Sequence, residues 1–554
     1  MPTVGSNPTP SATPMSTSSS SEPGLRHRRG ELIRRYLTAL RQLGDLPVDY
    51  TSLRDRLRVG ATDWWSSSEL REASLWRDST IGDQVLALAG VAQSAGDSSP
   101  TTLQYLLRAG TAWARSLLHS LRRRTKAGLA SDIIFVDYWT TSSAQSRSDE
   151  PASAWQSAYF TTLPDHLRKL GYSVAHLHIH ADGPVTKPPS GLRQSLRAVG
   201  HGSVRHLLVS DTISLPLVIR AFGKWLRLQS QIPRPASVRD NYPVEGDLRR
   251  LLPWWIAKLN ASLRGGHSVR IALLSEMFGR VVQANKDTAL WILAFEGQNW
   301  EACLAHQLQQ QGHEWLPYLH TMMRPWDLRA RTFLSEMPPR RIVVHGPHDA
   351  NELGDLGVPL VHVEALRYQH LSAGLRCESD TVVAGASRTG DSGQREWLVV
   401  GGADCEASRR ELSSFLAAMD FAGVRRRVSV RWHPQCQQPS DKASPAVHIT
   451  VEPLSVLTRR TVAALMVGSA AQLDTFLSGL PSCSLRASSG LEMSPIPEGS
   501  RHHVADSAQD AVRWMLAAES GAGFAPPVAE YFTVDESLTR WTEVVRESVR
   551  LSRP

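Results

Sequence analysis

From Ser131 onward, short apolar runs alternate with amphipathic segments, and this alternation limits the folds open to the chain more than any other feature. A first series of runs reads as buried strands: DIIFVDYW, VAHLHIH, HLLVSD and TALWILAFE. A second series follows, with RRIVVHGP, VPLVHVE, REWLVVGG, RRVSVRWHP, AVHITVE and AALMVGSAA. Strands that alternate with helices form parallel sheets covered on both faces. We therefore expect an α/β fold with two Rossmann-like domains that face a cleft.

The 554 residues are too many for one hydrophobic core. Changes in composition and periodicity along the chain suggest where its domains begin and end. Residues 1–29 begin with a Ser-, Thr- and Pro-rich stretch and are expected to form a disordered tail. The ranges that follow are predicted as a helical N-terminal region at 30–126, α/β domains at 127–335 and 336–530, and a C-terminal helix at 531–554. Ligands of such sheets bind beyond the carboxyl ends of the strands.

The net charge of +8 is concentrated near the N-terminus, where residues 1–130 carry 17 Lys and Arg against 11 Asp and Glu. An apolar stripe at helical spacing lies in this region, formed by Leu103, Leu106, Leu107, Ala114, Leu117, Leu118 and Leu121. We expect the stripe to pack against the next domain, and a membrane surface is the alternative. Because the remaining charge is nearly balanced and no basic-aromatic stripe occurs, no nucleic-acid partner is expected.

Cysteine and histidine patterns favour neither a disulfide framework nor a metal site. The cysteines are scattered, odd in number and form no CxxC pair: Cys303, Cys377, Cys405, Cys436 and Cys483. His176, His178 and His180 alternate along one predicted strand and would share a face, but one short strand rarely supplies a closed metal site.

No apolar run reaches the ~18–20 residues that cross a bilayer, and no signal-peptide pattern is present. These patterns predict a cytoplasmic protein without metal or other cofactor.

The stretch FEGQNWE, residues 295–301, joins a predicted buried strand to a predicted helix. Glu296 lies at the end of the strand, where a carboxylate could accept a proton from an attacking hydroxyl group. Glu301 falls in the first turn of the helix, where negative charge complements the helix dipole. The residues alone leave two interpretations of Glu296 open, a structural carboxylate and a general base.

Two turns in the C-terminal half suit a phosphate group. In RVSVRWHP, His433 and Pro434 end a predicted strand, so that the imidazole and the guanidinium of Arg431 could meet an anion. The second turn, in ALMVGSAAQLDTFLSG, contains the small residues Gly468, Ser469 and Ala470. Small residues between a strand and a helix let a phosphate approach free backbone N–H groups. A lone His-Pro is weak evidence for a site, and tight packing would explain the second turn equally well. No Walker A, GxGxxG or Asp-x-Asp pattern accompanies them.

The order of these segments resembles bacterial surface-carbohydrate biosynthesis proteins of the O-antigen and capsule type, which are GT-B-like glycosyltransferases. The resemblance covers residues 60–510 and rests on DWWSSSELREASLW, FEGQNWE, YLHTMMRPWDLR, VVHGPHDANELGDLGVP, ALRY, RWHP and GSAAQLDTFLSGLP with SPIPEGS. The arrangement is also similar to metal-independent sialyl and Kdo transferases. In those enzymes an acidic motif supplies the base, and His-Pro and serine motifs hold the nucleotide phosphate.

Carried over by position, the resemblance implies a role for each matching residue. Glu296 would be the base, while His433 with Pro434, and Ser469 with its neighbours Gly468 and Ala470, would hold the nucleotide-sugar. Ser494 would lie at the donor edge, and His320, Arg324 and Arg431 would line the cleft. The chain departs from the family in two places, because GSAA replaces a serine pair and EGQ replaces two acids before the glycine.

The resemblance implies inverting, metal-independent transfer of a sugar from a nucleotide-sugar donor, with CMP-linked donors favoured. The acceptor would be a surface glycan or a lipid-linked glycan, reached by peripheral contact with the cytoplasmic face of the inner membrane. Two alternatives stay open. One is a teichoic-acid-like glycerophosphotransferase, and the other is a non-catalytic scaffold of a glycan assembly complex.

Overall fold

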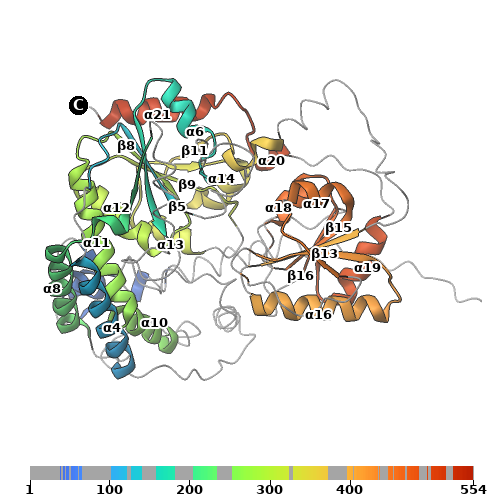
Figure 1. Cartoon of the computed structure of the whole chain (residues 1–554), viewed down its shortest axis with the longest axis horizontal. Helices are drawn as coiled ribbons and strands as arrows, with labels where there is room; N and C mark the ends of the chain where they lie inside the picture. The colour runs from blue at the N-terminus through green and yellow to red at the C-terminus, as the bar shows by residue number, and fades with distance from the viewer. Residues whose placement is uncertain are drawn as a thin grey trace, which may run out of the picture.

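Two parallel α/β domains and a group of N-terminal helices make up the protein (Figure 1). The computed structural model describes residues 102–121, 127–139, 157–180, 204–233, 252–323, 328–371, 396–402, 405–433, 447–452, 454–467, 471–485, 501–519 and 528–552, Cys436, Ser494 and Ile496, and parts of 38–64. The fold class expected from the sequence, an α/β protein with two Rossmann-like domains, is confirmed by two separate parallel sheets.

The first sheet has seven parallel strands in the order β11-β10-β9-β8-β5-β6-β7. The strands are β5 Ile133–Trp139, β6 Val174–His180, β7 Arg205–Leu208, β8 Leu290–Ala294, β9 Trp315–Tyr318, β10 Ile342–Val344 and β11 Leu360–His362. Every residue of β6 and β8 is buried, as expected for central parallel strands covered on both faces. The carboxyl ends of β5, β8 and β9 therefore meet at one edge of the sheet.

Helices cover the two faces of this sheet unequally. One face meets a large helical layer made of α4 Thr102–Ser120, α8 Leu215–Gln231, α10 Leu252–Arg264, α11 Gly266–Ala284, α12 Asn299–Gln310 and α13 Leu328–Glu336. The other face meets α6 Leu163–Lys169 and the last helix, α21 Thr539–Ser552. Shorter elements are η1 Val209–Thr212, α14 Pro347–Leu353, η3 Gly354–Leu356 and η4 Leu366–Leu371.

The second sheet has six parallel strands in the order β14-β13-β12-β15-β16-β17. Its strands are β12 Glu396–Gly401, β13 Arg427–Arg431, β14 Val447–Ile449, β15 Thr461–Val467, β16 Ser482–Leu485 and β17 His502–Ala505. The helices are α16 Cys405–Phe421, α17 Leu454–Arg460, α18 Gln472–Leu477 and α19 Ala508–Glu519. The short helix α20 Val528–Tyr531 packs against α14 of the first domain and against α18. Helices α16 and α19 pack on one face, and α17 packs on the other.

The boundary expected at residues 335 and 336 differs from the sheet topology. The runs RRIVVHGP and VPLVHVE were assigned to the second series, yet their strands β10 and β11 extend the first sheet through β9. A parallel strand followed by a helix has the same sequence pattern in either domain. Only the pairing of Val343 with Tyr318 decides which sheet these strands join.

The last helix returns from the second domain to the first and covers its open face (Figure 1). The carboxylate of Glu364 accepts the backbone N–H groups of Arg540 at 2.9 Å and Trp541 at 3.0 Å, and thus caps the helix start. The Trp541 indole is fully buried and donates to the Glu364 carbonyl at 2.9 Å. Helix α21 is therefore part of the first domain's core.

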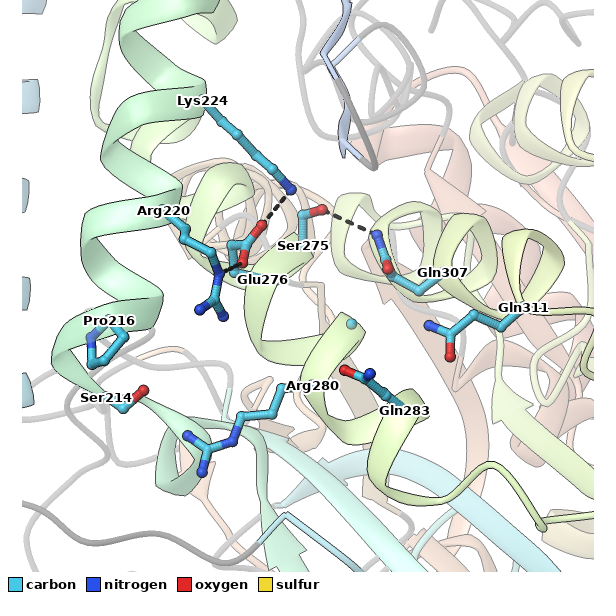
Figure 2. A pocket seen from close by; sticks show the side chains of 11 residues that line it. Ser214, Pro216, Arg220, Lys224, Ser275, Glu276, Arg280, Gln283, Gln307 and Gln311 are labelled. Atoms are coloured by element: carbon cyan, nitrogen blue, oxygen red, sulfur yellow. Dashed lines mark hydrogen bonds and ion pairs between the residues drawn. The ribbon is translucent and has the colours of Figure 1, made fainter.

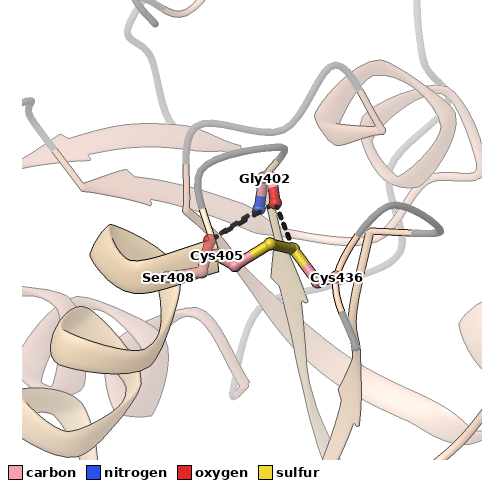
Figure 3. The surroundings of a disulfide bond; sticks show 4 residues. All are labelled: Gly402, Cys405, Ser408 and Cys436. Carbon is pink, nitrogen blue, oxygen red and sulfur yellow. Dashed lines mark hydrogen bonds between the residues drawn. A yellow bond between two sulfur atoms is a disulfide. The ribbon is translucent and has the colours of Figure 1, made fainter. Parts of the chain in front are cut away.

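A disulfide joins Cys405 to Cys436, which corrects the expectation that the cysteines stay unpaired (Figure 3). Cys405 begins α16 after β12, and Cys436 follows β13 by five residues. Because β12 and β13 are neighbours in the sheet, residues just beyond their carboxyl ends come together, with Cα atoms 5.5 Å apart. A separation of 31 residues carries no sign of this proximity in the sequence. Cys303 and Cys483 are buried and take part in no disulfide, and Cys377 lies outside the described residues.

The N-terminal region departs from the expected pattern in two ways. Besides helices α2 Leu53–Arg56 and α4, it contains two antiparallel strand pairs, β1 Pro47–Val48 with β2 Thr51–Ser52 and β3 Arg58–Val59 with β4 Thr62–Asp63. In addition, α4 packs through Ala109, Trp113, Ser116 and Ser120, whereas the leucine stripe expected to pack on the next domain is exposed. In the part of the chain that the structure describes, no helix is long and apolar enough to span a membrane.

We predict that Trp541→Ala lowers the free energy of unfolding of the first domain by about 3–5 kcal/mol, because it removes a fully buried indole and its hydrogen bond. Urea denaturation followed by circular dichroism measures the change. Arg546 is exposed on the same helix, so Arg546→Ala should change stability by less than about 0.5 kcal/mol. Equal effects of the two substitutions would contradict the covering role of α21.

Candidate functional site

Glu296 lies two residues beyond β8, at the carboxyl edge of the first sheet, with a side chain that is 24% exposed. Both carboxylate oxygens have partners. Oε1 lies 3.2 Å from Nε2 of His320, which follows β9, and Oε2 accepts the Gln298 amide at 2.6 Å. The carboxylate thus points neither into the core nor freely into water. It is oriented by two side chains and stays partly exposed.

Glu301 serves the turn itself, as expected from its place in the first turn of α12. Its fully buried carboxylate accepts the backbone N–H groups of Glu296 at 3.1 Å, Gly297 at 2.6 Å and Gln298 at 2.9 Å. Together with the Gln298 side chain it forms a capping box at the start of the helix. Gly297 has φ 75°, a left-handed conformation that glycine adopts without strain. The turn therefore holds the Glu296 backbone in place through Glu301.

A chain of hydrogen bonds reaches Glu296 from the core. The buried Trp300 indole donates to the Tyr138 hydroxyl at the end of β5, and that hydroxyl donates to the Gln298 amide oxygen. The Gln298 nitrogen then donates to Glu296. Burial raises the pKa of Tyr138, and the carboxylates of Glu301 and Glu296 raise it further, so this hydroxyl keeps its proton. The chain fixes the direction of the Glu296 carboxylate.

Arg367 connects this site to the second domain. It lies in η4, and its Nη2 is 3.4 Å from Oδ2 of Asp474 in the first turn of α18. On the first domain's side, the Tyr159 ring packs edge-on against His320 with centroids 4.7 Å apart. Burial raises the pKa of Tyr159, as do Glu296 and Asp137, while the positive charge of Arg367 opposes the rise. Arg367, whose side chain is 39% exposed, thus pairs with the start of α18.

The second domain supplies His433 and Arg431 at the corresponding edge of its own sheet. Arg431 ends β13, and His433 follows it, half-buried, with its carbonyl accepting the N–H of the disulfide-bonded Cys436 at 2.8 Å. Burial lowers the pKa of Arg431, and Arg367 lowers it further, while Asp474 opposes these effects. The disulfide therefore constrains the loop that carries the histidine.

The other predicted site residues are placed as follows. Ser494 is buried, and its hydroxyl lies 2.9 Å from His502 Nε2 and donates to the Ile496 carbonyl, so its expected role at the donor edge stays a prediction. Several predicted residues lie outside the described residues, namely Arg324, Pro434, Gly468, Ser469 and Ala470. Their roles as cleft and phosphate ligands likewise stay predictions.

One cluster of the first sheet has the composition of a metal site. Asp137, His176 and His178 place one possible ligand atom each within 4.8 Å of one another. Both ring nitrogens of His178 are engaged, at 2.6 Å from Asp137 and 2.9 Å from His206, and Ser157 donates to Asp137 at 2.6 Å. Burial lowers the pKa of His206 to about 2 and also lowers that of His176. We interpret the cluster as a network of hydrogen bonds between imidazoles and one buried carboxylate.

Sequence reasoning did not identify Arg367, Tyr138, Tyr159 or Gln298 as site residues. Arg367 lies within ALRY, which was noted only as part of a family resemblance. An arginine on a turn between two predicted strands has no periodic signal of its own. The tyrosines belong to aromatic segments that the pattern predicts as core. Only the folded structure shows which residues at the edge of the sheet lie next to them.

Comparisons with known proteins concern the fold alone. No family model matches the chain, and no curated protein matches it. Solved structures that align with it include UDP-GlcNAc 2-epimerases from Methanocaldococcus jannaschii (9% identity, 75% of this chain and 99% of that chain, TM-score 0.43) and Rickettsia bellii (9%, 76% and 97%, 0.43). The glycosyltransferase SnogD from Streptomyces nogalater also aligns (11%, 76% and 95%, 0.32).

The two acids of FEGQNWE should respond differently to substitution. Glu301→Ala leaves three backbone N–H groups without their acceptor, so we expect it to lower the free energy of unfolding by about 2–3 kcal/mol. Glu296→Gln keeps the side chain's shape at a partly exposed position, so we expect a change below about 1 kcal/mol. Thermal and urea denaturation of the two variants measure this contrast. A larger loss from Glu296→Gln would identify Glu296 as the structural carboxylate.

Proposed function

We propose that this chain is a GT-B-type glycosyltransferase that moves a sugar from a nucleotide-sugar to a glycan or lipid-linked glycan, with inversion and without a metal ion. The observation that carries the proposal is the Glu296 carboxylate, partly exposed at the carboxyl edge of the first sheet and oriented by His320 and Gln298. The cationic Arg431 and the imidazole of His433 at the matching edge of the second sheet support it. Ligands of parallel sheets bind at these edges.

In the proposed reaction, an acceptor hydroxyl attacks the anomeric carbon of the donor in a single displacement. The bond from the hydroxyl oxygen to that carbon forms as the bond from the carbon to the phosphate oxygen breaks. The hydroxyl proton passes to Glu296, and the electron pair of the broken bond leaves with the nucleotide phosphate. His433 and Arg431, with the turn at residues 468–470, stabilise the charge on that phosphate.

The finer assignments rest on the sequence resemblance. It supports a surface polysaccharide of the O-antigen or capsule type as the product and a CMP-linked sugar as the donor, as in sialyl and Kdo transferases. A thermal-shift screen against CMP-, CDP-, UDP- and GDP-linked donors tests the nucleotide. Product analysis separates glycosyl transfer from two other outcomes, glycerophosphate transfer from CDP-glycerol and epimerisation of the nucleotide-sugar without transfer. Either of these products alone would contradict the proposal.

We predict that Glu296→Gln lowers kcat at least about a hundredfold, because general-base assistance contributes about 10²–10⁴-fold. The affinity for the donor should change little, since the amide keeps the size of the side chain. Steady-state kinetics with the donor identified by the screen, together with calorimetry, separates the two quantities. A matched control is Glu543→Gln, at an exposed position of α21 outside the proposed site, which should keep kcat. Near-normal turnover of the Glu296 variant would exclude it as the base.

His433→Ala should mainly weaken nucleotide binding, because the imidazole is proposed to donate to a phosphate oxygen. We expect the dissociation constant for the free nucleotide to rise about tenfold or more, as measured by calorimetry. His503→Ala is a control in the same domain, on β17 beyond the proposed site. Unchanged nucleotide affinity in the His433 variant would remove this residue from the phosphate site.

A further inference from the structure

Helices α4 and α8 lie on the outer side of the first domain's helical layer (Figure 1). Both expose large apolar side chains to solvent. These side chains are between 36% and 67% exposed: Leu103, Leu106, Leu107, Leu117 and Leu118 on α4, Leu121 directly after it, and Leu215, Ile219, Phe222 and Leu226 on α8. The helices touch through Trp113 and Phe222, whose ring centroids are 5.2 Å apart. The two exposed stripes therefore adjoin at that contact, and we call them together the α4–α8 face.

Cations flank the α4–α8 face on both helices. At 100° per residue, Arg108 and Arg115 align along α4 beside its exposed stripe, on the side away from Trp113. Arg220, Lys224 and Arg227 occupy the equivalent position along α8. Neither helix, of 19 and 17 residues, contains an Asp or Glu. An apolar stripe bordered by cations and free of acids on its own helices is the pattern of a helix that lies at a membrane surface.

A hollow of about 700 Å³ opens between α8, α11 and α12 on the cationic side of α8 (Figure 2). Three cations line it, Arg220, Lys224 and Arg280, against the single carboxylate of Glu276. Arg220 lies 2.9 Å from Glu276, and Lys224 pairs with the same carboxylate. The hollow thus carries an excess of two positive charges among these four side chains, next to the apolar stripe of α8.

From these observations we infer that the α4–α8 face docks on a lipid bilayer that contains anionic phospholipids. The exposed leucines, Ile219 and Phe222 enter the interfacial region, while the flanking arginines and the hollow at Arg220 and Arg280 receive phosphate head groups. The combination selects this partner, because a neutral bilayer would leave the cations unmatched and a soluble polyanion would leave the apolar side chains in water. The inference rests on the proposed function in one respect: docking on the bilayer would bring the enzyme to a lipid-linked acceptor.

Vesicle co-sedimentation of the full chain tests the inference without donor or acceptor, so its outcome is independent of catalysis. We expect binding to vesicles of phosphatidylglycerol with phosphatidylcholine, weakened by salt, and little binding to phosphatidylcholine alone. The double variant Leu107→Asp/Ile219→Asp should lose at least about tenfold in partition. The charge variant Arg108→Glu/Arg115→Glu should lose a similar factor and leaves the apolar stripe intact. Circular dichroism checks that each variant is folded.

Phe421 supplies the matched control, since it is 90% exposed at the end of α16 in the second domain. Phe421→Asp should leave vesicle binding unchanged. Equal binding by the wild-type chain and both face variants would overturn the inference. Absence of wild-type binding to anionic vesicles would also overturn it. In that case sedimentation velocity tells whether a second copy covers the face, as a dimer that the aspartate variant dissociates, or whether the chain covers it itself, as a monomer.

Discussion

Glu364 accepts the first N–H groups of α21 and so anchors the end of the chain on the first sheet. The cover of the first sheet depends on this contact, because a parallel sheet exposes apolar side chains unless both of its faces are covered. Helix α6 covers only part of one face, and Trp541 with its neighbours on α21 completes the cover. The chain consequently passes from the first domain to the second and back again.

Glu296 and Glu301 differ in role because their surroundings differ. Glu301 is fully buried, and a buried carboxylate is tolerated only when hydrogen-bond donors replace water, here three backbone N–H groups. Glu296 keeps solvent contact and is held by two side chains. Side chains that orient a carboxylate without covering it preserve its ability to accept a proton. The same turn therefore combines a backbone fixed by Glu301 with the partly exposed carboxylate of Glu296.

Several features were predictable because they depend on local pattern. Uniformly apolar strands with helices between them predicted parallel sheets, and the spacing of Glu301 from the strand end predicted its place in the first helical turn. The errors concern contacts between distant segments. The membership of β10 in the first sheet and the bond between Cys405 and Cys436 depend on which strands are neighbours. The buried side of α4 depends on the contact of Trp113 with α8, because the pattern of an amphipathic helix does not indicate which of its stripes packs against protein.

The sequence by itself determined the alternating strands and helices of the two α/β domains, their fold class and the candidate residues Glu296 and His433, because periodicity and turn chemistry are local properties. The tertiary structure alone decided what surrounds those residues. It placed His320 and Gln298 on the two oxygens of Glu296, positioned Arg367 beside α18, and left the leucines of α4 in solvent. These arrangements come from strand order and helix packing, in which residues separated by tens to hundreds of positions meet, and no pattern within one segment encodes them.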